Sequence, residues 1–443
     1  MNRKKIVFSS GIANTFEWYD YVLFGYFAPI IGTKFFPNDD ANTSLLQAFL
    51  VFAIGYLARP LGGIFFGVIG DKFGRKAALT GALFCMSAPT VLIGILPTYH
   101  TIGITATISM IVVRILQGLS MGGALTGSIS FVIEHTYPKH RGFTGSISMS
   151  SICAGLLLGS FVSYIVKNIL NAEQFDSFGW RIPFLLGFFI LFAAFYIKNH
   201  THETPNFKNL KEQKKIQNSP LKKVITKHWF DILISIFINA PGSIIFYLHA
   251  IYLVSFLKIS RNFIENEVNS LASVCYVIMI AITLLSGYLS DVIGRRKIFV
   301  INLVVIIIAT PFLLNNFETG NFTGVIISQF ILAVLAASYI GPEPALQAEF
   351  YPTEIRNTAL SLSYNTATTI FGGTTPLVFE YLVQKTGQVT SAVYYIILSC
   401  ILALIALFFY KPILDSKNSE DAAIHFEEFY IFKEVDMCGK AFG

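Results

Sequence analysis

Two acidic residues, Glu17 and Asp20, interrupt an apolar stretch near the start of the chain. They are three residues apart, so a helix would place both carboxylates on one face. A carboxylate at the centre of a lipid bilayer costs about 2.5 to 3.5 kcal/mol on scales derived from membrane insertion. Because ionisable residues at this depth mark ion or substrate pathways, the pair predicts a proton-binding site within a membrane helix.

Two arginines can balance these acids. Arg59 and Arg114 lie near the middle of two later apolar stretches, at a depth similar to that of the acids. Four unpaired charges there would cost on the order of 10 kcal/mol, so we expect them to face a helix-bundle interior and to pair at least in part. An arginine can hold a substrate carboxylate, and its withdrawal allows a nearby acid to bind a proton. Static ion pairs that only join helices are the alternative.

The composition is that of a protein that crosses a membrane many times. Of 443 residues, 54% are hydrophobic and 13% are charged, and the mean hydropathy is +0.61. Apolar runs of about 20 residues, which span about 30 Å of hydrocarbon, recur along the chain and exclude a soluble protein with a large core. The five cysteines contain no CxxC pair, so we expect neither disulfides nor a metal site.

Hydropathy, together with the Pro, Gly and charged residues that separate the apolar runs, predicts an all-α protein with twelve transmembrane helices in two six-helix bundles. The predicted parts are an N-terminal bundle over 1–198, a cytoplasmic linker over 199–228, a C-terminal bundle over 229–411 and a cytoplasmic tail over 412–443. The predicted spans are residues 10–35, 46–69, 77–97, 102–126, 143–167, 180–198, 229–257, 268–289, 298–316, 322–344, 358–384 and 390–410.

Lysine and arginine are distributed unevenly between alternate loops. One side holds 21 of them, eight in the segment 198–228, and the other side holds six. Cytoplasmic loops are enriched in these residues, so the richer side and both termini are predicted to face the cytoplasm. The net charge of +6 therefore reflects membrane topology, and we expect no nucleic-acid partner.

The two halves contain related turns. GVIGDKFGRKAAL follows the second predicted span and GYLSDVIGRRKIF follows the eighth, which places Asp71 and Arg75 220 residues before Asp291 and Arg295. EHTYPKHRG after the fourth span corresponds in the same way to EFYPTEIRN after the tenth. Repeated bundles imply a pseudo-twofold axis along the membrane normal and a binding site between them near the midplane.

These motifs resemble those of a known family. GDKFGRK resembles the major facilitator superfamily signature between helices 2 and 3, and RILQGLSMGG resembles the helix 4 motif of its proton-linked carriers. EWYDYVLFGYFAPIIGTKFFP followed by ARPLGG is similar to the metabolite:proton symporters, which carry proline, betaine, citrate, 2-oxoglutarate or shikimate. The resemblance covers residues 10–410 and implies the major facilitator fold with no cofactor. In one departure, GPEPALQAEF contains an extra acid, Glu343, to which we assign no role.

The resemblance implies roles for several residues. Arg114 is expected to partner the proton-binding acid, Arg59 to hold the substrate, and the repeated turns to stabilise a closed state. Paired glycines on the second, fourth and fifth spans, such as Gly118 and Gly122, are expected to allow close helix packing. The candidate sites are proton-coupling Glu17, Asp20 and Arg114; substrate-binding Asn14, Tyr21, Arg59, Gln117, Asn239 and Tyr247; and the gate Asp71, Gly74, Arg75, Asp291 and Arg295.

The sequence therefore predicts a transporter that moves a small organic acid or zwitterion together with a proton by alternating access. A proton-linked antiporter or exchanger of amphipathic or organic-acid compounds is the alternative, although the fifth span lacks the Gly-Pro motif usual in antiporters of the superfamily. Because no GxxxxGK[ST] motif or catalytic constellation is present, we expect neither an enzyme nor an ATP-driven pump. Abundant Ile, Phe, Asn and Lys are typical of an AT-rich bacterial genome and therefore indicate a bacterial inner membrane. We also expect a monomer.

Overall fold

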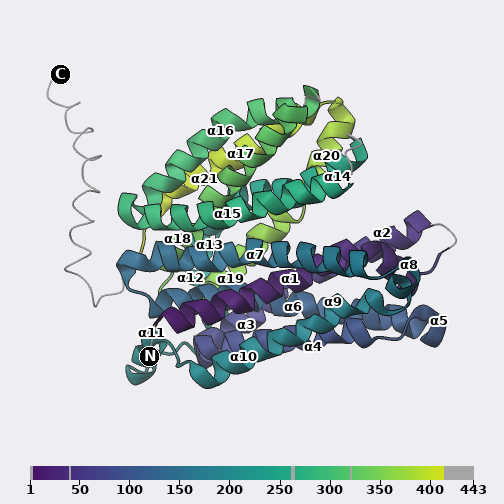
Figure 1. Cartoon of the computed structure of the whole chain (residues 1–443). Coiled ribbons are helices and arrows are strands. Elements are labelled where there is room, and N and C mark those ends of the chain that lie inside the picture. Colours follow the sequence, from purple (N-terminus) through teal and green to yellow (C-terminus); the bar gives the residue numbers. More distant parts are fainter. Residues whose placement is uncertain (1–2, 39–40, 261–264, 320–321, 414–443) are drawn as a thin grey trace.

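The chain is a long bundle of helices in two groups (Figure 1). A computed structural model describes residues 3–38, 41–260, 265–319 and 322–413. Within these ranges, twelve long helical segments follow one another, six before the linker and six after it. The predicted all-α architecture of two six-helix halves is thus confirmed.

The first half includes an uninterrupted 33-residue helix and several helices with breaks. Its second segment turns at Ala58, its sixth contains a 3-10 turn, and short helices lie at the ends of others. The bounds are α1 (Arg3–Phe35), α2 (Ala41–Leu57), α3 (Arg59–Phe73), α4 (Arg75–Ile95), α5 (Tyr99–Ile102), α6 (Ile104–His135), α7 (Arg141–Ile169), α8 (Ala172–Gln174), α9 (Arg181–Leu185) and α10 (Phe189–His200).

The second half is interrupted in three of its six segments. Two π-helical turns, η4 (Leu248–Tyr252) and η5 (Thr368–Gly372), divide the first and fifth segments. Gly341 and Pro342 divide the fourth. The bounds are α13 (Trp229–Tyr247), α14 (Leu253–Ser260), α15 (Glu265–Ile293), α16 (Arg295–Thr319), α17 (Phe322–Ile340), α18 (Glu343–Glu349), α19 (Arg356–Ala367), α20 (Thr375–Thr386) and α21 (Val393–Phe409).

Ten helices of the described residues are long and apolar enough to cross a membrane. The two predicted spans that are not among them are 10–35, which carries Glu17 and Asp20, and 358–384. The second of these begins with RNTALSLSYNTA, whose Ser, Thr and Asn lower its hydropathy. The polar residues of both segments are mostly buried: Glu17 and Asp20 of α1 and most of α19 lie inside the bundle, whereas Leu377 and Tyr381 of α20 are exposed.

The glycines allow the close packing that the sequence predicts. A Cβ atom at Gly118 of α6 would lie 1.8 Å from the carbonyl oxygen of Gly55, and one at Gly122 would lie 2.0 Å from that of Arg59. The backbones of α6 and of α2 and α3 are therefore in contact. Gly155 of α7 also lies close to α1, where its Cβ would be 2.5 Å from the carbonyl oxygen of Thr15. These contacts bring the charged residues of α1, α3 and α6 together.

The halves meet along two seams. In Figure 1, α7 of the first half runs beside α15 of the second, and α3 packs against α19. The linker forms two short helices, α11 (Pro205–Glu212) and α12 (Pro220–Lys227), at the same end of the bundle as the start of α1 (Figure 1). We call this the linker end. The predicted tail lies outside the described residues from residue 414 onward.

Candidate functional site

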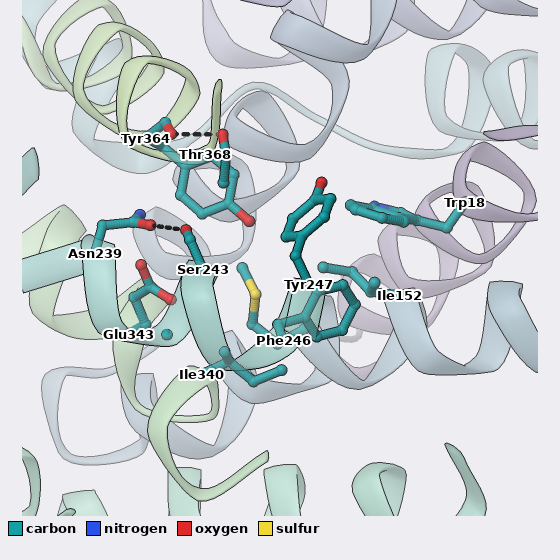
Figure 2. Close-up of a pocket in the computed structure, with 12 residues that line it drawn as sticks. Trp18, Ile152, Asn239, Ser243, Phe246, Tyr247, Ile340, Glu343, Tyr364 and Thr368 are labelled. Atoms are coloured by element: carbon teal, nitrogen blue, oxygen red, sulfur yellow. Dashed lines mark hydrogen bonds between the residues drawn. The ribbon is translucent and has the colours of Figure 1, made fainter. Parts of the chain in front are cut away.

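A small cavity lies between the two halves, about halfway along α1, α7 and α13 (Figure 2). Its volume is about 20 Å³, room for one or two water molecules. Aromatic side chains form much of its wall, together with a few polar groups. The lining residues are Trp18, Met149, Ile152, Asn239, Gly242, Ser243, Phe246, Tyr247, Ile340, Glu343, Tyr364 and Thr368.

The polar groups of the cavity come from the second half. The hydroxyl of Ser243 donates to Asn239 Oδ1 at 2.7 Å, one turn away on α13. Asn239 Nδ2 and Glu343 Oε1 are buried and have no hydrogen-bond partner among the described residues. Glu343 is 3% exposed and follows the Gly341–Pro342 break, which starts a new helix and directs its carboxyl group into the cavity (Figure 2). The cavity thus presents an unused donor and an unused acceptor.

The first half carries a buried cation beside this cavity. Arg59 is 1% exposed, and none of its three guanidinium nitrogens donates a hydrogen bond to a described residue. The guanidinium lies 5.0 Å from the ring centre of Tyr56 and 5.9 Å from that of Trp18, which lines the cavity. Glu17 is fully buried and lies within electrostatic range of Arg59. Neither of its carboxylate oxygens accepts a hydrogen bond from a described residue.

Asp20 and Arg114 are joined by an amide. Gln117 Nε2 donates to Asp20 at 2.8 Å, and Arg114 Nη1 donates to Gln117 Oε1 at 2.7 Å. Gln117 Nε2 also lies 3.2 Å from the hydroxyl of Thr90 on α4. The Arg114 guanidinium stacks over Phe24 at 4.2 Å. Of the four charges, Asp20 and Arg114 are therefore connected only through the neutral side chain of Gln117, and among the described residues no ion pair joins any two of the four.

The structure separates the predicted substrate residues into three groups. Asn239 and Tyr247 line the cavity. Arg59 and Tyr21 lie behind its aromatic wall, and the ring centres of Tyr21 and Trp18 are 5.3 Å apart. Asn14, one turn before Trp18 on the same face of α1, donates to Ser128 at 3.0 Å, and Gln117 belongs to the Asp20 network, so neither lines the cavity.

Several lining residues were missed from the sequence. Trp18 lies within the EWYD motif, but an indole there resembles any core aromatic residue. Tyr364 and Thr368 precede or begin the π-helical turn η5, for which the sequence carries no recognisable signal. Glu343 was recognised in the sequence as an acid without an assigned role. The direction of its side chain depends on the helix break before α18.

The first repeat of the predicted gate joins the halves at the linker end. Asp71 accepts hydrogen bonds from the backbone N–H groups of Asn357 at 3.1 Å and Thr358 at 2.8 Å, at the start of α19. Arg75 pairs with Asp71 at 3.1 Å and with Glu134 at 3.1 Å. These side chains are fully buried. A carboxylate at the N-terminal end of a helix is a favourable partner for its free N–H groups.

The second repeat makes the same contacts at the other seam. Asp291 accepts from the backbone N–H groups of Gly142 and Phe143, both at 2.8 Å, near the start of α7. Arg295 pairs with Asp291 at 2.6 Å and with Glu349 at 3.3 Å. Each half therefore holds the first turn of a helix in the other half.

Four charged residues of the gate were not among the predicted ones. Glu134 pairs with Arg356 at 3.2 Å, and Glu349 lies 3.9 Å from Arg141. All four belong to the repeated segments EHTYPKHRG and EFYPTEIRN, so the repeat was the signal that would have found them.

The linker contributes to this end of the molecule. Glu203 accepts hydrogen bonds from the backbone N–H groups of Arg75 at 3.0 Å and Lys76 at 3.2 Å. Gly74 has a φ of 113°, and a Cβ there would lie 2.1 Å from Glu203, so only glycine fits. Burial raises the pKa of the Glu203 carboxyl above its ordinary value. Thr204 donates to Glu134 at 2.6 Å, which connects the linker to the gate.

Comparisons with known sequences identify two family models. The model described as "Sugar (and other) transporter" matches residues 6–231, and that of the "Major Facilitator Superfamily" matches residues 242–433. A Staphylococcus aureus relative is 33% identical over 408 residues, which cover 92% of this chain and 88% of the relative. The proline/betaine transporter of Salmonella typhimurium is 31% identical, over 91% of this chain and 82% of that protein. The glycine betaine/proline/ectoine/pipecolic acid transporter OusA of Dickeya dadantii is 30% identical, with coverage of 92% and 83%.

Solved structures show the same fold. The proton:xylose symporter XylE with bound 6-bromo-6-deoxy-D-glucose superimposes with a TM-score of 0.76 at 16% sequence identity, over 92% of this chain and 94% of that one. The inward-open form of XylE from E. coli gives a TM-score of 0.63 at 18% identity, over 94% and 98%. At these identities the likeness concerns the fold alone.

Proposed function

The chain belongs to the major facilitator superfamily and is a multi-pass membrane transporter, not an enzyme, and we propose that it imports a small zwitterion or carboxylate together with a proton. The observation that carries this proposal is the set of four buried ionisable side chains, Glu17, Asp20, Arg59 and Arg114, beside a cavity between two repeated bundles. Charges at this depth are costly and mark substrate and ion pathways. The relatives do not favour the alternative of an antiporter.

Arg59 is proposed to hold the carboxylate of the substrate. Its guanidinium has no hydrogen-bond acceptor in the described part of the chain, although it is almost fully buried. A substrate carboxylate would supply both charge and two acceptors in one planar contact. Relatives named for proline and betaine transport, whose substrates carry a carboxylate, support this assignment.

Glu17 and Asp20 are proposed to couple transport to protons. Glu17 has no hydrogen-bond partner among the described residues, whereas Asp20 is held by Gln117. A carboxylate in such surroundings gains or loses its proton when a nearby arginine changes position or partner. Substrate binding at Arg59 would change the charge next to Glu17, which is the link that symport requires.

Alternating access is proposed to proceed by separation of the bundles at either end. The predicted gate residues are proposed to hold the linker end closed, and the bonds between Asp71 and the start of α19 support this role. At the other side of the cavity, the hydroxyls of Tyr56 and Tyr247 are hydrogen-bonded across the halves. A cavity of about 20 Å³ is smaller than any substrate of the proposed class, so a bundle movement must accompany binding.

The cellular setting follows from the charge distribution. We place the linker end and both termini in the cytoplasm because of the excess of Lys and Arg on that side. A bacterial inner membrane and a monomeric state complete the proposal.

The test separates coupling from binding. In vesicles, Glu17→Gln or Asp20→Asn should abolish accumulation of radiolabelled proline or glycine betaine driven by a pH gradient, yet retain exchange of internal for external substrate. Arg59→Gln should lose exchange and accumulation together, because the carboxylate then has no counter-charge. Asp176→Asn, which removes one partner of an exposed ion pair with Lys34, is the matched control.

Two results would contradict the proposal. If both amide variants accumulate substrate normally, these acids do not couple transport to protons. If all three variants lose folded protein in equal measure, as judged by expression and gel filtration, the four charges form static ion pairs instead.

A further inference from the structure

We propose that Glu343 binds the positively charged group of a zwitterionic substrate whose carboxylate is held by Arg59, so that one ligand joins the two bundles. This assignment rests on the proposed function and specifies its substrate class. It predicts a carrier for amino acids and betaines in which a single negative charge without a positive one is not enough for binding.

Glu343 has the properties of a ligand-binding carboxylate. It lines the cavity, is 3% exposed, and has an oxygen without a hydrogen-bond partner in the described ranges. The residues around it offer no compensating cation, since the wall of the cavity contains neither lysine nor arginine. A buried carboxylate without a counter-ion is costly, and a cationic ligand would remove that cost.

Arg59 provides the opposite charge on the opposite side. Its guanidinium lies against Trp18, and Figure 2 shows Trp18 and Glu343 on different sides of the cavity. A positive group therefore lies behind the cavity wall in the first half, and a negative group lies in the wall of the second half.

The space between these ends suits an ammonium group. Four aromatic side chains, those of Trp18, Phe246, Tyr247 and Tyr364, line it. Aromatic faces attract cations, and they are effective for quaternary ammonium groups, which have no N–H to donate. Asn239 Nδ2 is an additional unused donor for a substrate oxygen.

This arrangement discriminates between substrates that share a carboxylate. A dicarboxylate would place its second negative charge near Glu343 and be repelled. A neutral isostere would leave Glu343 buried and unpaired. Because like charges and unpaired buried groups both oppose binding, the positive group becomes a requirement of the site.

The experiment compares glycine betaine with 3,3-dimethylbutyrate, in which carbon replaces the quaternary nitrogen. Purified full-length protein in lipid nanodiscs is incubated with radiolabelled glycine betaine, and each compound is used as a competitor. The wild-type protein should prefer glycine betaine at least 10-fold. Glu343→Gln should reduce this preference to less than 3-fold by weakening betaine binding, and Glu343→Asp should retain part of it. The matched control is Glu380→Gln, which should behave as wild type. Glu380 is an exposed residue of α20 whose carboxylate accepts a hydrogen bond from Gln384.

The outcomes separate the two proposals. If radiolabelled glycine betaine does not bind the wild-type protein, the proposed substrate class is wrong. If glycine betaine binds but the isostere competes equally well, or if Glu343→Gln keeps the wild-type preference, only the role of Glu343 is refuted. A variant that keeps the preference but loses pH-driven accumulation would assign Glu343 to the proton and also refute the proposal. Should Glu343→Gln fail to fold, the preference of the wild-type protein for glycine betaine over 3,3-dimethylbutyrate and the preference of Glu343→Asp still test the proposal.

Discussion

Replacement of Asp71 by asparagine should open the linker end. In this structure the carboxylate of Asp71 receives two backbone N–H groups from α19, at 3.1 Å and 2.8 Å, and these bonds cross between the halves. Its ion pair with Arg75 lies within the first half and is i,i+4 on adjacent helices, so the pair can persist when the halves separate. The bonds to α19 are therefore among the contacts that differ between the closed and open states, and they are the ones that this substitution removes.

The magnitude follows from those bonds. Asparagine keeps one carbonyl oxygen, which can accept one of the two N–H groups, and it places an NH₂ group against the other. Loss of one hydrogen bond to a charged acceptor costs about 1.5 to 3 kcal/mol. A difference of this size shifts the equilibrium between closed and open states by about 10- to 150-fold towards the open state.

Cysteine alkylation measures this shift directly. Ser361 is fully buried at the same seam, where its hydroxyl is 2.7 Å from that of Thr126 in the other half. In purified protein whose five native cysteines are replaced, Ser361→Cys should react with N-ethylmaleimide only when the seam opens. While the closed state dominates, the rate is proportional to the open population, so Asp71→Asn should raise it about 10- to 150-fold.

The control for this test is a second Asp-to-Asn variant. Asp176→Asn makes the same substitution at a carboxylate that is 62% exposed and far from the gate, and it should leave the rate unchanged. If Asp71→Asn preserves the folded protein but leaves alkylation of Ser361→Cys within 3-fold of the parent rate, the bonds to α19 do not hold the seam closed.

Two further predictions concern packing and topology. Gly118→Ala should lower the thermal unfolding temperature in detergent or abolish folded protein, because the new Cβ would lie 1.8 Å from a backbone oxygen of α2, whereas Gly25→Ala, with nothing within 4 Å, should not; equal stability of the two variants would contradict the close approach of α2 and α6. A cysteine at Lys214 in the linker should resist an impermeant maleimide applied to intact cells and react after permeabilisation, and rapid labelling from outside would reverse the proposed orientation.

Much of the fold could be predicted because its signals are local. An apolar run long enough to cross a bilayer identifies a helix without knowledge of its neighbours, and the repeated GDKFGRK and SDVIGRRK turns indicate two related halves. The gate residues Asp71 and Asp291 were predicted for the same reason. Their bonding partners were not, because each carboxylate binds backbone N–H groups of a helix in the other half, and backbone groups leave no mark in a sequence.

The partners of the buried charges could not be predicted either. The sequence indicates that Glu17, Asp20, Arg59 and Arg114 lie at similar depth, but depth does not determine contact. In the structure, Asp20 is reached through Gln117, 97 residues away, while Arg59 and Glu17 form no hydrogen bond within the described residues. Glu343 was visible as an acid, and only the helix break before it shows that its carboxyl group enters the cavity.

The gate and the cavity use charge in opposite ways, and this contrast bears on the transport cycle. At the proposed gate, buried carboxylates such as Asp71 are fully paired, so these contacts between the halves are stabilised without a ligand. At the cavity, Arg59 and Glu343 are buried with unused hydrogen-bonding groups, so the same state carries an electrostatic cost there. A zwitterion that bridges the two would remove this cost only when the bundles approach each other around it. Because a ligand shifts an equilibrium by its differential affinity for the states, such a substrate would favour closure around itself, whereas a simple carboxylate would leave Glu343 unpaired and favour closure less.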